Sequence, residues 1–177
     1  EDTIGRITTA AQRWSCEFLS GWQDVTSRVH QMRFRGQEYT GKGQVVAIID
    51  SGVDLNDPRL KGAKIGGMSL SMNATQHVLI AGDFADENGH GTEVASAIHQ
   101  MAPDAELLCV KIMDARLRTT ADLMAAGIEV SAKHGCGVVN LSLGTPNMGK
   151  ALLLRDCCAA AVERGAVVLG AAHPKGE

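Results

Sequence analysis

The sequence lacks several features that would assign it to a class at once. None of its apolar runs approaches the roughly 20 residues that a membrane-spanning helix needs, so no membrane partner is predicted. Its net charge is only −3, so it lacks the basic surface expected of a protein that binds nucleic acid. The N-terminus has no basic region followed by an apolar core, and no signal peptide is visible.

Cysteine is present, but in a pattern that excludes the usual cysteine frameworks. The number of cysteines is odd, two of them are adjacent, and no CxxC pair occurs. Neither a disulfide set nor a zinc site is predicted, and most thiols are expected to be buried apolar groups. Free cysteines favour a cytoplasmic location but leave the location unknown. They are Cys16, Cys109, Cys136, Cys157 and Cys158.

Aromatic residues are scarce, at 3% of the chain, whereas apolar residues make up 45% of its 177 residues. The core must therefore be built from Ala, Val, Leu, Ile and Met, which suits helices packed closely on a sheet. Strand-like and helix-like segments alternate along the chain, which predicts an α/β fold with a parallel sheet and right-handed crossovers. No repeat or linker interrupts residues 41–177, which we interpret as one domain.

The expected elements follow from periodicity and from turn residues. Residues 1–40 are interpreted as an N-terminal helical segment that packs on the domain, with helices over 8–19 and 24–34. Residues 61–76 are rich in Gly and Ser and are expected to be irregular or edge structure. Strands are expected over 45–49, 77–81, 106–113, 138–143 and 166–172, and helices from about 92, from 120 or 122 to about 134, and over 149–164.

An acid stands at the end of the most apolar predicted strand. Residues 45–49 are all apolar and four of the five are β-branched, which is typical of a strand buried on both faces. Asp50 follows directly, and functional groups of α/β sheets gather just past the carboxyl ends of strands. An Asp at this position is equally suited to capping a turn. The strand alone therefore leaves both roles open.

A histidine between two glycines is the second candidate. His90 lies between Gly89 and Gly91 at the expected start of a helix. Glycine neighbours allow a backbone or a substrate to approach closely, at a cost in chain entropy. Such a histidine could take a proton from a hydroxyl if an acid held its other ring nitrogen, and Asp50 could be that acid. A lone histidine is more often structural, and spacing alone does not show that the two side chains meet.

Several blocks of the sequence resemble the subtilisin-like serine proteases. VAIIDSGVD at residues 46–54 resembles their aspartate segment, and NGHGTEVAS at residues 88–96 resembles their histidine segment. The resemblance runs from about residue 40 to 172 in family order. It implies a three-layer αβα fold with a mostly parallel sheet, incomplete at its C-terminus. Its further blocks are APDA at 102–105, VKIMD at 110–114, GIE at 127–129 and VNLSLG at 139–144.

The resemblance also implies roles for particular residues. Asp50 would orient and stabilise the imidazolium of His90, which would act first as general base and then as general acid. Ser142, Leu143 and Gly144 would offer backbone groups to an extended peptide that adds itself as a strand. The implied partner is a peptide or protein substrate.

No metal or other cofactor is assigned from the sequence. Calcium often stabilises proteases of this family, and acidic side chains do gather before the histidine segment. We interpret them as a solvated loop and not as a set of oxygen ligands for a metal ion. The cluster consists of Asp83, Asp86, Glu87 and Asn88.

The third member of the expected triad is missing. The family places its serine after the Asp and the His, in a Gly-Thr-Ser segment, yet no serine follows Ser142. AAHP at residues 171–174 stands where the family's oxyanion segment reads Ala-Ala-Gly-Asn, and Pro174 cannot donate a hydrogen bond. Glu93 replaces the second histidine of the family's motif.

Three explanations remain open. The chain is the N-terminal part of a longer serine endopeptidase, or a pseudo-peptidase that binds peptides or a partner protein, or one part of a split enzyme. In the last case the serine comes from a C-terminal fragment or a second chain. Removing the serine from such a triad costs on the order of 10⁶ in turnover, so these 177 residues alone should be inactive.

An alternative prediction, from another class of protein, is a doubly wound nucleotide-binding or phosphoaspartate domain. It is disfavoured, because no glycine-rich phosphate loop follows a strand. In addition, Gly52 stands where such phosphotransferases need a second acid.

Overall fold

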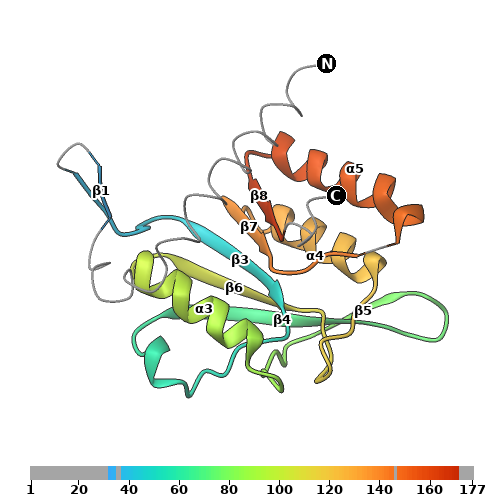
Figure 1. Ribbon diagram of the computed structural model, residues 1–177, viewed down its shortest axis with the longest axis horizontal. Helices are drawn as coiled ribbons and strands as arrows, with labels where there is room; N and C mark the ends of the chain where they lie inside the picture. The colour runs from blue at the N-terminus through green and yellow to red at the C-terminus, as the bar shows by residue number, and fades with distance from the viewer. Residues whose placement is uncertain (1–31, 35–36, 146, 172–177) are drawn as a thin grey trace. The chain divides into compact units, whose positions relative to one another are not determined.

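The computed structural model describes residues 32–34, 37–145 and 147–171 (Figure 1). The chain divides into two compact units, Glu1–Glu38 and Tyr39–Glu177. All helices and strands discussed for the site belong to the second unit.

Two short strands near the boundary form a sheet of their own, β1 (Met32–Phe34) and β2 (Gln37–Tyr39). The helix predicted over 24–34 is therefore wrong at its C-terminal end, where β1 stands. The remainder of that helix, and the one predicted over 8–19, lie outside the described residues.

A six-stranded sheet forms the centre of the second unit, in the order β5-β4-β6-β3-β7-β8. All neighbouring pairs are parallel except β4 and β5, which are antiparallel. A short hairpin can only return the chain antiparallel, so the sheet is mostly parallel, as predicted. The strands are β3 (Val45–Asp50), β4 (Lys64–Met72), β5 (Val78–Ala81), β6 (Glu106–Lys111), β7 (Val138–Leu141) and β8 (Val167–Gly170).

Strand β4 corrects part of a second prediction, because residues 64–72 form a regular strand; Lys64–Met68 do lie at an edge, since only Ser69–Met72 pair with β5. It pairs with β5 on one side and with β6 on the other. Its glycines serve close packing: a Cβ at Gly67 would lie 2.5 Å from the carbonyl oxygen of Cys109 and 2.9 Å from the ring of Phe84. Glycine in a strand marks a close approach of this kind as well as irregular structure.

Helices cover both faces of the sheet, which gives the three layers that the resemblance implies (Figure 1). Helix α3 (His90–Met101) packs on one face, where Ala95 joins Val46 and Ile48 of β3 in one apolar cluster. Helices α4 (Ala121–Lys133) and α5 (Ala151–Glu163) cover the other face, where Ile128 and Ala161 join a second cluster. Short 3₁₀ turns occur at η1 (Pro58–Leu60) and η2 (Met148–Lys150).

Local signals set the start of helix α4 as the sequence predicts. Thr120 precedes the helix in an extended conformation, and its hydroxyl accepts a hydrogen bond from the Leu123 N–H at 3.2 Å. Within the described ranges, no helix combines the length and apolar character that would let it cross a membrane.

Candidate active site

Asp50 ends β3, on the sheet face that α3 covers. Side chains of a strand alternate between its two faces. Val46 and Ile48 belong to the α3-side cluster, so Asp50, two positions further, points the same way, whereas Ala47 and Ile49 pack on the opposite side. Asp50 is fully buried, at 0% exposure. The prediction of a strand covered on both faces is confirmed.

His90 begins α3 and meets Asp50. The preceding Gly89 has φ = 100°, a left-handed conformation that turns the loop into the helix. The Nδ1 atom of His90 lies 2.7 Å from Oδ1 of Asp50, and the imidazole side chain is 40% exposed. A carboxylate only accepts hydrogen bonds, so Nδ1 donates, and in the neutral imidazole Nε2 then carries the lone pair. The structure thus brings together the two residues whose contact the spacing left open.

The two oxygens of Asp50 have different surroundings. Oδ1 also accepts a hydrogen bond from the Ser51 N–H at 2.7 Å, while Oδ2 is buried without a hydrogen-bond partner among the described residues. Lys111 is paired with Asp50 in the sheet register, yet its ammonium group donates to Ala85 O at 2.6 Å and to Glu87 Oε1 at 3.0 Å. The lysine therefore holds the loop before His90.

The close approach of α3 to β3 requires glycine at position 91. A Cβ on Gly91 would overlap the carbonyl oxygen of Gly52 and would lie 3.2 Å from the Cβ of Asp50. Gly52 has φ = 117°, and a Cβ there would lie 2.5 Å from the carbonyl oxygen of Phe84. The prediction that a glycine beside the histidine permits a close backbone approach is confirmed for Gly91.

The three predicted substrate-binding residues directly follow β7 in the chain. Ile49 of β3 pairs with Leu141 of β7, so Asp50 and Ser142 lie at the carboxyl ends of two neighbouring parallel strands. Asn140 Nδ2 donates to Ser142 Oγ at 2.8 Å. Within the described part of the chain, no hydrogen bond reaches the backbone of residues 142–144.

The acidic cluster before His90 divides among separate partners. Asp83 Oδ1 accepts from the Ala85 N–H at 3.0 Å, Glu87 pairs with Lys111, and Asp86 turns towards α3. Among the described residues, no group of three or more His, Cys, Asp or Glu side chains is placed to hold a metal ion. The expectation that the chain carries no cofactor stays a prediction.

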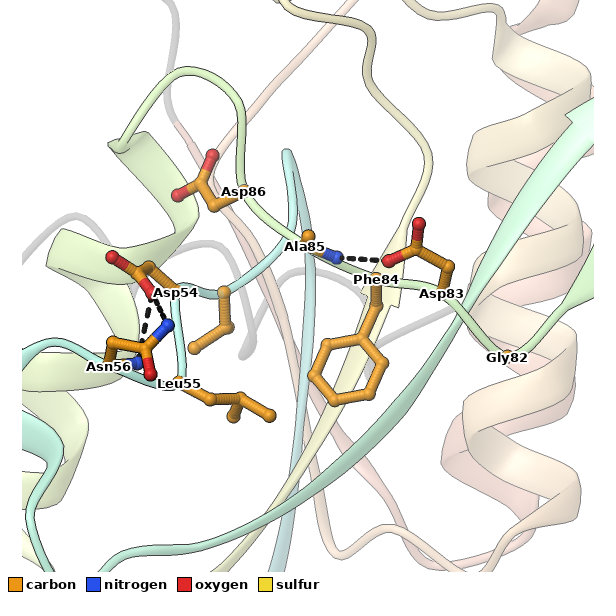
Figure 2. Close-up of a pocket in the computed structure, with 9 residues that line it drawn as sticks. Asp54, Leu55, Asn56, Gly82, Asp83, Phe84, Ala85 and Asp86 are labelled. Carbon is orange, nitrogen blue, oxygen red and sulfur yellow. Dashed lines mark hydrogen bonds between the residues drawn. The ribbon is translucent and has the colours of Figure 1, made fainter.

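Beside the cluster lies a pocket of about 310 Å³, between residues 53–56 and 82–86 (Figure 2). It is lined by apolar side chains such as Phe84 and by the acids Asp54, Asp83 and Asp86.

The prediction of a solvated loop is wrong for Asp86, which is partly buried and contacts α3. Its carboxylate accepts hydrogen bonds from the backbone N–H groups of Asn88, Gly89 and Thr92, at 3.0, 2.9 and 2.9 Å. The available signal was the order Asp-Glu-Asn-Gly, because an Asp before such a turn commonly accepts from the backbone two or three residues on.

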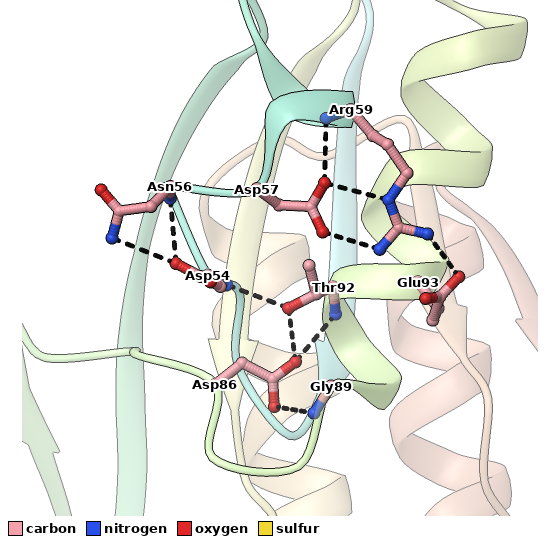
Figure 3. A network of polar contacts seen from close by, with 8 residues as sticks. All are labelled: Asp54, Asn56, Asp57, Arg59, Asp86, Gly89, Thr92 and Glu93. Atoms are coloured by element: carbon pink, nitrogen blue, oxygen red, sulfur yellow. Dashed lines mark hydrogen bonds and ion pairs between the residues drawn. The ribbon is translucent and has the colours of Figure 1, made fainter.

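Two of the positions that depart from the family's motifs lie at least partly within the described residues. Glu93 lies in the first turn of α3 and accepts a hydrogen bond from Arg59 Nη1 at 2.8 Å, so a salt bridge stands at the position of the expected histidine (Figure 3). In the stretch 171–174, Ala171 N donates to Leu141 O at 3.1 Å. The rest of that stretch lies outside the described residues.

A buried acid at the carboxyl end of an interior strand, bound to a half-exposed histidine, is a pair suited to acid–base chemistry. Comparison with known proteins places the chain in a family. The model of the Subtilase family, Peptidase S8, matches residues 41–172. Subtilisin E of Bacillus subtilis (strain 168) is 32% identical over 159 residues, and Subtilisin BL of Lederbergia lenta is 32% identical over 162 residues; each match covers 85% of this chain.

The fold has solved counterparts as well. A cold adapted subtilisin-like serine proteinase superposes with a TM-score of 0.60 at 24% identity, over 82% of this chain and 54% of the other. A lanthipeptide protease gives a TM-score of 0.61 at 25% identity, over 76% of this chain and 40% of the other. The chain belongs to the subtilase family of serine proteases. It spans 39% of the length of Subtilisin E and 55% of that of Subtilisin BL.

Proposed function

We propose that this chain forms the acid- and base-bearing part of a serine endopeptidase that hydrolyses peptide bonds. Its catalytic residues are Asp50 and His90, and the serine of the triad lies outside the 177 residues. The observation that carries the proposal is the 2.7 Å contact between Asp50 Oδ1 and His90 Nδ1.

The geometry of the pair suits general base catalysis. With Nδ1 bound to the buried carboxylate, Nε2 of His90 takes the proton of a hydroxyl nucleophile and later gives it to the leaving amine. The imidazolium formed in between is stabilised by the charge of Asp50, which acts in a site screened from water. The 40% exposure of the His90 side chain leaves it open to a substrate.

The substrate is an extended peptide held beside residues 142–144, which follow β7. The backbone groups of Ser142, Leu143 and Gly144, just past the end of β7, have no hydrogen-bond partner in the described part of the chain. A peptide in extended conformation pairs with such groups as an added strand. Ser142 follows the strand next to that of Asp50, so a peptide bound there passes the catalytic pair.

A further polypeptide supplies the serine. The apolar surface around β8 supports this point: Leu152, Val167 and Leu169 are 64%, 55% and 50% exposed. Strand β8 pairs only with β7 among the described strands. An apolar surface at an open sheet edge is the kind that another segment covers. The 39% share of Subtilisin E that the chain matches leaves room for such a segment.

A fluorophosphonate probe tests the proposal, because it labels only an activated serine. The 177-residue chain should stay unlabelled. A longer polypeptide from the same gene that includes a Gly-Thr-Ser segment should be labelled, and D50N and H90A substitutions should abolish the labelling.

Two outcomes would overturn parts of the proposal. Labelling of the 177-residue chain would show a nucleophile within it. A gene that ends at Glu177 would favour the pseudo-peptidase, unless adding a second chain that bears the serine restores labelling, as a split enzyme requires.

A further inference from the structure

We propose that Asp86 is a positioning residue that, through Ser51, holds the end of β3 and the start of α3 at the separation at which Asp50 and His90 meet. The catalytic meaning of this role rests on the proposed function.

Asp86 is the centre of a network of five hydrogen bonds, part of which Figure 3 shows. Its Oδ1 accepts from Gly89 N, Asn88 N and Ser51 Oγ at 2.9, 3.0 and 3.0 Å. Its Oδ2 accepts from the backbone and the hydroxyl of Thr92 at 2.9 and 2.5 Å. One carboxylate thus binds the loop before α3, the first turn of α3 and the segment after β3.

Ser51 turns this network into a bridge that runs beside the catalytic pair. Its hydroxyl donates to Asp86 and accepts from the Gly91 N–H at 3.0 Å. Ser51 directly follows Asp50, and Gly91 directly follows His90. The bridge therefore fixes the two backbones one residue beyond the two side chains that must meet.

Thr92 adds a second connection to the same strand end. Its hydroxyl donates to Asp86 and accepts from the Asp54 N–H at 3.0 Å (Figure 3). Ser51 and Thr92 are 2% and 4% exposed, so both hydroxyls are removed from water. Buried polar groups of this kind are costly to leave unpaired, which makes the network specific for one arrangement of the two segments.

The charge of Asp86 strengthens these hydrogen bonds. Burial by itself raises the pKa of this carboxyl, but the hydrogen bonds from Thr92, Gly89 and Asn88 outweigh it and lower the pKa to about 2. Hydrogen bonds to an ionised acceptor are roughly twice as strong as neutral ones. A negative charge before the first turn of α3 also compensates the helix dipole.

The test reads the Asp50–His90 contact directly in the 177-residue chain. The proton on Nδ1 of an imidazole that donates to a carboxylate gives a strongly deshielded NMR resonance. This resonance should be present in the wild-type chain and absent in D50N, which identifies it. It should be lost, or reduced to a small fraction, in D86A and S51A, and should be retained in S51T, which keeps the hydroxyl.

Two controls separate positioning from general destabilisation. D83N alters a neighbouring acid of the same loop whose carboxylate bonds Ala85 N. T120A removes the cap of α4 and should lower stability by about 1 kcal/mol without touching the site. Both variants should keep the resonance.

The proposal is overturned if folded D86A or S51A retains the resonance at wild-type intensity. If D86A does not fold, folded S51A decides the question, because it removes the hydroxyl that joins Asp86 to Gly91; full retention of the resonance there refutes the bridge. These results are independent of the serine, so the proposed endopeptidase function can fail in the probe experiment while the positioning role holds, and the reverse.

Discussion

Gly91 passes so close to Gly52 that the carbonyl oxygen of Gly52 occupies the space a Cβ of residue 91 would need. This contact joins the first turn of α3 to the segment that follows β3. It explains in physical terms why the residue after His90 has no side chain. Only with the two backbones this close can Asp50 and His90 form a direct hydrogen bond.

Substitution of Gly91 by Ala tests this contact. We expect G91A to lower the free energy of unfolding by about 1–3 kcal/mol, because the new methyl group meets rigid backbone. Alanine is by itself the better helix former, so a net loss of stability can only come from the clash. Urea denaturation measures the loss, and the deshielded His90 resonance should disappear with it.

The matched control is G82A. Gly82 has open space where a Cβ would stand and no left-handed backbone, so its change should remain within about 0.5 kcal/mol. Equal stability of G91A and wild type would show that the helix start can move away at no cost.

Asp86 should make stability depend on acid in a defined direction. Its pKa is about 2 in the folded chain, below the ordinary value of 3.8. Its contribution is therefore complete above the unfolded value and is lost as the pH falls towards 2. The stability difference between wild type and D86N should be constant between about pH 5 and pH 7 and shrink below about pH 4. Urea denaturation across this range measures it, and a difference that stays constant down to pH 2.5 (about the lowest practical value) would contradict the assignment.

The Arg59–Glu93 pair should contribute little to stability, although it replaces a motif residue. The two side chains are 40% and 66% exposed, so water screens their 2.8 Å contact. A double-mutant cycle with R59A and E93A should give a coupling energy below about 1 kcal/mol that falls with added salt. E93H, which introduces the family's histidine, should leave the fold intact. A coupling above about 2 kcal/mol would indicate a structural role for the pair.

Cys109 should be the least reactive thiol of the described cysteines. It lies in β6 with no exposure, and burial, together with the charges of Asp50 and Asp86, raises its pKa to about 12. Cys157 is partly exposed on α5 and should react first with iodoacetamide, although burial raises its pKa too. Peptide mass spectrometry after alkylation should find Cys109 modified only in denaturant. Equal rates for the two thiols in the native chain would contradict this order.

The fold could be predicted where local pattern and tertiary environment agree. The apolar run at 45–49 became the buried strand β3, and Thr120 caps α4 as its side chain suggests. The same local reasoning was partly wrong at β4, where Gly and Ser predicted irregular or edge structure and the structure has a regular strand. There the small residues serve a close approach to Cys109 and Phe84, which lie far away in the sequence.

The residues of the candidate site could be predicted from the sequence, but the contacts between their side chains could not. The sequence by itself determined which residue types end β3 and begin α3, because Asp50 and His90 stand in short motifs with flanking glycines. Only the tertiary structure decided that their side chains meet, since the contact spans 40 residues and depends on how α3 crosses the sheet. It also decided that Asp86 faces inward. From sequence alone, an acidic loop is predicted to be solvated. The fold brings the buried hydroxyls of Ser51 and Thr92, which belong to two separate segments, within hydrogen-bond distance of Asp86.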